Sequence, residues 1–99
     1  MIFKQYFPQN SSQAEIIEII RKEGFEPQLI TDKPGFIYGT HTHAETKYIA
    51  CIEGSMKVTI NGKCYNFEPG DKIIIGASIP HSGVVGDKGC KYLWSEKVI

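Results

Sequence analysis

The sequence has no excess of either charge and no long apolar run. Eleven Lys and Arg residues balance eleven Asp and Glu residues. No basic stripe marks a nucleic-acid interface, and no apolar run approaches the roughly 18 residues that a membrane-spanning helix needs. Met1–Phe7 also lacks the long apolar segment and the cleavage site of a signal peptide. We therefore expect a cytoplasmic protein that binds neither nucleic acid nor a membrane.

Cysteine is scarce, and its spacing does not favour cross-linking. The three cysteines, Cys51, Cys64 and Cys90, are an odd number and form no CxxC pair. A disulfide framework and a zinc site built from cysteines alone are both disfavoured by this pattern. We expect the cysteines to act as small apolar residues on strands, with a redox or ligand role for one of them as the alternative.

The sequence also lacks internal repeats, linkers and low-complexity segments. Its 99 residues are therefore predicted to form one domain, residues 1–99. An apolar fraction of 41% is enough for one core. At this size the margin of stability is thin, and oligomerisation is a common remedy.

One helix is predicted, at about residues 12–23. Ser12 and Glu15 have the spacing of a capping box. The four isoleucines that follow form an apolar stripe, and Gly24 stands where a helix commonly ends. Because this stripe must be covered, the helix is expected to pack on a sheet or on a partner subunit.

From Phe25 onward the chain has the pattern of short strands separated by turns. Asn61-Gly62, between two alternating segments, is a strong signal for a β-hairpin. The remaining strands are predicted at residues 28–31, 48–52, 56–60, 63–67, 72–75, 81–85 and 90–94. Many short strands with Gly and Pro turns are typical of a β-sandwich or β-barrel.

The three histidines carry the main functional signal. His41 and His43 are two residues apart, so on a strand both rings would project from the same face. His81 follows a run that ends in a turn. Imidazole is a common ligand for zinc, iron, copper and nickel. The pattern predicts a site for one divalent metal ion, against the plain alternative of surface or hydrogen-bonded histidines.

At this point the residues resemble the cupin superfamily. Its first motif, G-x5-H-x-H-x3-4-E-x6-G, is matched by Gly35, His41, His43 and Gly54, and Gly70 and His81 have the spacing of the second motif. The resemblance covers about residues 33–94. It implies an all-β fold, a jelly-roll β-barrel with one N-terminal α-helix, and a metal held in the barrel mouth by His41, His43 and His81.

The sequence departs from the family pattern at the carboxylate position, where it has Lys47. An ammonium group cannot ligate a cation. Glu45, which has the same strand parity as His41 and His43, is a candidate for an additional ligand or for a partner of Lys47. Three alternatives for Lys47 remain. It turns out to solvent, or it faces inward and binds an anionic substrate, or it neutralises a site that has lost its metal.

Three functions are compatible with these residues. The first is a metal-dependent enzyme of dioxygenase or isomerase type, acting on a small polar molecule. The second is a non-catalytic module that binds a metal or small ligand, and the third is a structural barrel with a vestigial site. The metal is iron, zinc, nickel, manganese or copper, and Tyr38, Lys47 and Trp94 are candidates for substrate contact.

A homodimer is also predicted. The isoleucine-rich helix and the apolar Met1–Phe7 segment leave more apolar surface than one short barrel can cover. Small cupins that resemble this chain commonly pair through the edges of their sheets.

Overall fold

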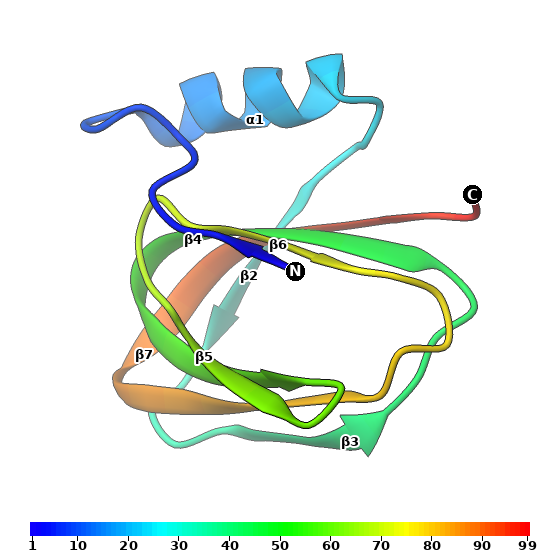
Figure 1. Cartoon of the computed structure of the whole chain (residues 1–99). Coiled ribbons are helices and arrows are strands. Elements are labelled where there is room, and N and C mark those ends of the chain that lie inside the picture. Colours follow the sequence, from blue (N-terminus) through cyan, green and yellow to red (C-terminus); the bar gives the residue numbers. More distant parts are fainter.

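A computed structural model describes all residues, 1–99, and shows one helix and seven strands (Figure 1). The elements are β1 (Ile2–Phe3), α1 (Gln13–Lys22), β2 (Gln28–Asp32), β3 (Ile37–His41), β4 (Thr46–Ile60), β5 (Lys63–Phe67), β6 (Lys72–Ile75) and β7 (His81–Lys97). All strand pairs are antiparallel, in the order β1-β6-β4-β7-β2, with β3 on β7 and β5 on β4. The predicted all-β, jelly-roll class with one helix is confirmed, although the sheet does not close fully.

Two long strands, β4 and β7, form the spine of the sheet. They pair from Thr46↔Lys97 to Ile60↔His81. The sequence pattern predicted four shorter strands here, and that prediction was wrong because β-bulges keep the pairing continuous. The register shifts between Cys51 and Glu53 and again between Gly54 and Met56. Such bulges bend a strand without ending it.

Glycine is required where the two bent strands touch. Gly54 has φ +77°, and a Cβ atom there would lie 2.0 Å from the carbonyl oxygen of Gly89.

The hairpin predicted at Asn61-Gly62 is confirmed between β4 and β5. Both turn residues have positive φ, as a two-residue type I′ turn demands.

Alternating residues of β4 face two different cores. Ile49 and Cys51 belong to the core inside the barrel. Tyr48 and Ala50 belong to a second core with Phe7 and the helix. Because side chains alternate along a strand, Lys47 is directed to the same side as Ile49, into the barrel.

The helix covers the outer face of the sheet (Figure 1). It begins with the predicted capping box, in which Ser12 and Glu15 exchange side-chain to backbone hydrogen bonds. Ile16 and Ile20 are buried against β4 and β7. The isoleucine stripe is thus covered by the chain's own sheet. The single helix lacks the length and the apolar character that crossing a membrane requires. The cytoplasmic location and the single-domain organisation stay predictions.

The cysteines are all free thiols. Cys51 and Cys90 are buried, as expected for small apolar residues, and their sulfur atoms lie 4.0 Å apart. Cys64 is exposed, because it faces outward on the β5 hairpin.

A partly buried ion pair joins Glu23, at the end of the helix, to the sheet. Lys72 Nζ lies 2.8 Å from Glu23 Oε1, and 4.1 Å and 4.6 Å from the ring centroids of Tyr6 and Tyr48. Both tyrosine hydroxyls donate to Glu23 Oε2. Burial alone would raise the pKa of Glu23, but the bonds from Lys72 and the two tyrosines outweigh it and hold the pKa below its ordinary value of 4.5.

This ion pair predicts acid sensitivity. A lowered folded-state pKa adds stability that is present above pH 4.5 and is lost as the pH falls through the folded-state value. We expect Glu23→Gln to cost about 1–3 kcal/mol at pH 7 and to weaken the dependence of unfolding free energy on pH in the acid range. Urea unfolding between pH 3 and pH 7 measures both effects. The control is Glu18→Gln, at an exposed helix position, and equal curves for the two variants would contradict the assignment.

Candidate functional site

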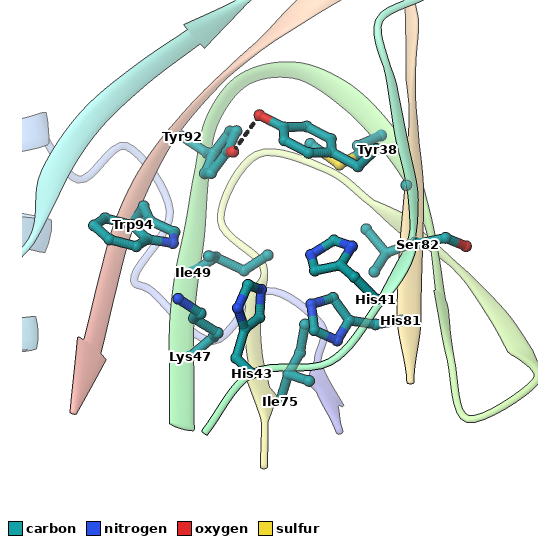
Figure 2. Close-up of a pocket in the computed structure, with 13 residues that line it drawn as sticks. Tyr38, His41, His43, Lys47, Ile49, Ile75, His81, Ser82, Tyr92 and Trp94 are labelled. Atoms are coloured by element: carbon teal, nitrogen blue, oxygen red, sulfur yellow. Dashed lines mark hydrogen bonds between the residues drawn. The ribbon is translucent and has the colours of Figure 1, made fainter. Parts of the chain in front are cut away.

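The three histidines lie together at the barrel opening (Figure 2). Ligand nitrogens from His41, His43 and His81 all lie within 4.8 Å of one another. Their ring centroids are separated by 4.3 Å to 5.0 Å. His81 lies at least 38 residues along the chain from the other two histidines. The fold, and not the local sequence, therefore creates the cluster.

Pairing of two strands places the first and third histidines. His41 ends β3 and His81 begins β7, and the two are cross-strand partners. The expectation that His41 and His43 share one strand was wrong, because β3 ends at His41. His43 lies in the following loop, where its carbonyl oxygen accepts a hydrogen bond of 2.7 Å from Ser78 N. This bond ties the His43 loop to the loop that precedes β7.

Two of the rings are oriented by their own backbone. His41 Nδ1 lies 2.5 Å from the carbonyl oxygen of Gly39, and His81 Nδ1 lies 2.8 Å from that of Ile79. A carbonyl only accepts, so each Nδ1 carries the proton and each Nε2 keeps a free lone pair. Histidines that ligate metals typically donate their second ring nitrogen in this way. The donor set therefore fits a divalent metal ion.

The local electrostatics favour the neutral form of two of the three rings, those of His43 and His81. Burial lowers the pKa of the His43 and His81 imidazoles, and the ammonium of Lys47 and the neighbouring histidines lower both further. The carbonyl of Ile79 opposes this at His81 without reversing it. Neutral imidazole is the form that binds a metal.

The histidines border a cavity of about 220 Å³ inside the barrel. Its walls combine an apolar core with a few polar groups (Figure 2). The lining residues are Tyr38, His41, His43, Lys47, Ile49, Met56, Val58, Ile75, His81, Ser82, Gly83, Tyr92 and Trp94. Mostly apolar walls with a few convergent polar groups are typical of a small-molecule site.

Lys47 faces into this cavity and is not turned to solvent, so the first of the three alternatives for it was wrong. Its side chain is 7% exposed and forms an ion pair with Glu96, its cross-strand partner on β7. The ammonium also lies 4.8 Å from the centre of the Trp94 ring. Lys47 is paired on both sides in the middle of the sheet, with Ile75 of β6 and Glu96 of β7.

Glu45 does not line the cavity and does not pair with Lys47. The sequence pattern predicted that Glu45 shares a strand face with His41 and His43. That prediction was wrong because Glu45 lies in the bend before β4, where strand alternation does not apply. Its carboxylate acts on the site only through its charge, which favours the protonated form of His43. Glu96 is the carboxylate that the sequence reasoning missed.

The candidate contact residues Tyr38 and Trp94 both line the cavity. Tyr38 donates a hydrogen bond to Asp32 and lies 2.8 Å from the hydroxyl of Tyr92. Sequence reasoning missed Tyr92 and Asp32 as parts of the site. Only the register of β2, β3 and β7 brings them to Tyr38, and no spacing in the sequence marks it.

Comparison with known proteins agrees with this architecture. A family model described as a cupin domain matches residues 28–96. The cupin domain of Schizosaccharomyces pombe Cnp3 superposes with a TM-score of 0.70 at 12% identity, covering 76% of this chain and 56% of that one. An RmlC-like cupin from Shewanella frigidimarina gives 0.68 at 17% identity, covering 76% and 67%. These two likenesses show the fold alone.

A third similar structure is a larger protein. A variant of oxalate decarboxylase from Bacillus subtilis superposes with a TM-score of 0.65 at 27% identity, covering 71% of this chain. This chain spans only 20% of that enzyme, which is described as having Mn(II) centres. No curated protein matches the sequence.

The Lys47–Glu96 pair predicts an unequal effect of removing either partner. Glu96→Gln leaves the nearly buried ammonium of Lys47 without its counter-ion and should cost about 3 kcal/mol of unfolding free energy. Lys47→Met leaves Glu96, which is 34% exposed, and should cost about 1 kcal/mol or less. Urea unfolding of metal-free protein measures both, and a larger loss for Lys47→Met would contradict this account.

Proposed function

The chain belongs to the cupin domain family, and on that basis we propose that it binds one divalent metal ion through His41, His43 and His81 and acts as a metal-dependent enzyme on a small polar molecule. The observation that carries the proposal is the cluster of three ring nitrogens within 4.8 Å on the wall of the cavity. Two of those rings are held by backbone carbonyls with Nε2 free.

A bound metal would supply Lewis-acid chemistry or open positions for oxygen. The residues of the chain supply the walls of the cavity in which the metal and the substrate would meet. The cavity walls include the apolar side chains of Ile49, Met56 and Val58. Low polarity around the metal strengthens electrostatic interactions with a bound molecule. A dioxygenase or an isomerase is the reaction type that we propose.

The charge of the site favours an anionic molecule. Three neutral imidazoles do not offset a divalent cation, and no carboxylate lies in the ligand cluster. Lys47 is already balanced by Glu96. A metal-loaded site therefore carries a net charge of about +2, which a carboxylate group on the substrate would reduce. In the second alternative for Lys47, its side chain faces inward and binds an anionic substrate. The side chain does line the cavity, where it is paired with Glu96.

Manganese is one candidate for the metal, because oxalate decarboxylase is described as having Mn(II) centres. Iron, zinc, nickel and copper also suit imidazole ligands. The competing function is a non-catalytic metal- or ligand-binding barrel, or one with a vestigial site. It is favoured by Lys47 at the position where the family motif has a carboxylate.

Metal analysis tests the proposed centre. Protein purified without a nickel column should bind about one equivalent of divalent metal, and His43→Ala should lose most of it because two imidazoles rarely suffice. Thr42→Ala is the matched control, since Thr42 is exposed between the two histidines. Plasma emission spectrometry and calorimetric titration measure the stoichiometry. Equal metal content in both variants, with unchanged circular dichroism, would exclude this ligand set.

We also propose a homodimer, on a surface other than the one the sequence suggested. Ile16 and Ile20 of the helix are buried within the protomer. The exposed apolar residues instead include Ile37 and Val84, which are 68% and 47% exposed and are cross-strand partners on β3 and β7. Neighbouring apolar residues of this size on an outer sheet face suit a partner subunit.

Light scattering tests the dimer. We expect about twice the protomer mass of 11.1 kDa at micromolar concentration, and a monomer for Ile37→Lys because the charge would be buried without a counter-ion. Ala14→Lys, on the exposed side of the helix, is the control and should leave the mass unchanged. A wild-type mass near 11.1 kDa would rule out the dimer.

A further inference from the structure

A chain of three hydrogen-bonding groups borders the cavity at some distance from Lys47 and His43 (Figure 2). Tyr92 on β7 and Tyr38 on β3 both line the cavity, and their hydroxyl oxygens lie 2.8 Å apart. Tyr38 also donates to Asp32 Oδ2 at 2.5 Å. Asp32 ends β2 and does not itself line the cavity. The proposed metal centre uses none of these three residues.

The direction of the hydrogen bonds in this chain is fixed by Asp32. An ionised carboxylate only accepts, and a phenol has a single proton to give. Because the proton of Tyr38 goes to Asp32, the bond between the two hydroxyls must be donated by Tyr92. The proton of Tyr92 is then donated to the oxygen of Tyr38. The oxygen of Tyr92 therefore offers only lone pairs to the cavity.

Both phenols keep their protons at neutral pH. Burial raises the pKa of Tyr92 to about 12. Burial and the bond to Asp32 raise the pKa of Tyr38 well above its ordinary value. Neither hydroxyl therefore becomes a phenolate, and the direction of the hydrogen bonds persists across the physiological range.

We propose that the cavity selects a small carboxylate that carries a hydrogen-bond donor, a hydroxyl or an amino group, at the end remote from Lys47 and His43, where Tyr92 accepts it. This rests on the proposed function for the carboxylate end, which lies at the metal and Lys47. Tyr92 is the group that contacts the ligand, and Asp32 is a positioning residue that sets the polarity through Tyr38.

The size of the cavity limits the ligand to a short molecule. Its 220 Å³ is below the roughly 300–1,000 Å³ of sites for drug-sized ligands. Apolar side chains, including Ile49 and Val58, line the cavity together with these polar groups. A ligand that fits this pattern has a short hydrocarbon spacer between its carboxylate and its donor group.

Trp94 gives a direct readout of binding. It is the only tryptophan of the chain and lines the cavity, so its emission should change when a ligand enters. The probes are matched pairs that differ only in the remote group: 3-hydroxybutanoate and 3-oxobutanoate, 4-hydroxypentanoate and 4-oxopentanoate, and 5-hydroxyhexanoate and 5-oxohexanoate. Each pair is titrated into zinc-loaded and metal-free protein.

The expected result is a preference for the hydroxy acid in the wild type. A ketone places an acceptor against the acceptor oxygen of Tyr92, and an unpaired buried polar group costs enough to lower affinity by about tenfold or more. The preference should be seen for the pair whose spacer matches the cavity. A ratio near one for every pair, or binding of none of them, would overturn the proposal.

Two variants separate recognition from a merely structural role. Asp32→Asn can donate to Tyr38, so the bond direction is no longer fixed and Tyr92 can turn its proton toward the cavity. We expect the ketone to gain affinity and the ratio to fall toward one. Tyr92→Phe should lower the affinity for the hydroxy acid and leave that for the ketone nearly unchanged. Asp87→Asn, at an exposed position, is the control and should keep the wild-type ratio.

The same titrations distinguish this inference from the proposed function. If zinc binds with the expected stoichiometry but no pair is discriminated, the metal centre stands and the inference fails. If metal-free protein discriminates the pairs while no variant or condition yields bound metal, the inference stands and the proposed metal centre fails. An unchanged ratio in both Asp32→Asn and Tyr92→Phe would exclude the hydroxyl chain as the selecting group.

Discussion

The pairing of β4 with β7 is the constraint on which the rest of this structure depends. These strands contribute nine of the residues that line the cavity: Lys47, Ile49, Met56 and Val58 from β4, and His81, Ser82, Gly83, Tyr92 and Trp94 from β7. A slip by one residue would exchange the two faces of a strand. Tyr48 would then enter the barrel, and Lys47 would meet the helix. The bulges around Gly54 shift the register where the strands bend and let the pairing continue beyond them.

Local signals in the sequence predicted the helix and the hairpin, whereas the lengths of the long strands and their register were not predicted. The capping box at Ser12 and the hairpin at Asn61-Gly62 depend on neighbouring residues, so the sequence shows them directly. The pairing of Lys47 with Glu96 depends on the register of strands 49 residues apart, which spacing does not reveal. Glu45 was the nearer carboxylate in sequence, and the bend before β4 takes it out of the alternation.

The sequence predicted the cluster of three histidines and, on the cavity wall, Lys47, Tyr38 and Trp94. It did not predict the groups that pair with those wall residues, which are Glu96, Asp32 and Tyr92. A motif with fixed spacing identified His41, His43 and His81 as a group, because the family resemblance supplies the long-range relation that composition lacks. Nothing comparable marked Tyr92, an aromatic residue among eleven Phe, Trp and Tyr residues. Its hydroxyl matters only because Tyr38 and Asp32 lie next to it. Polar groups that act through hydrogen-bonded neighbours are difficult to find before the fold is known.

The tethering of two histidine rings to the carbonyls of Gly39 and Ile79 has a consequence for how such a site can change. Each ring is oriented by the residue two positions before it on the same segment, and no distant side chain takes part. The orientation of these two rings is thus encoded in two tripeptides. Mutations that reshape the cavity walls can accumulate without disturbing that orientation. The arrangement would let selection, or a protein engineer, change what the barrel recognises while the histidine geometry is inherited intact.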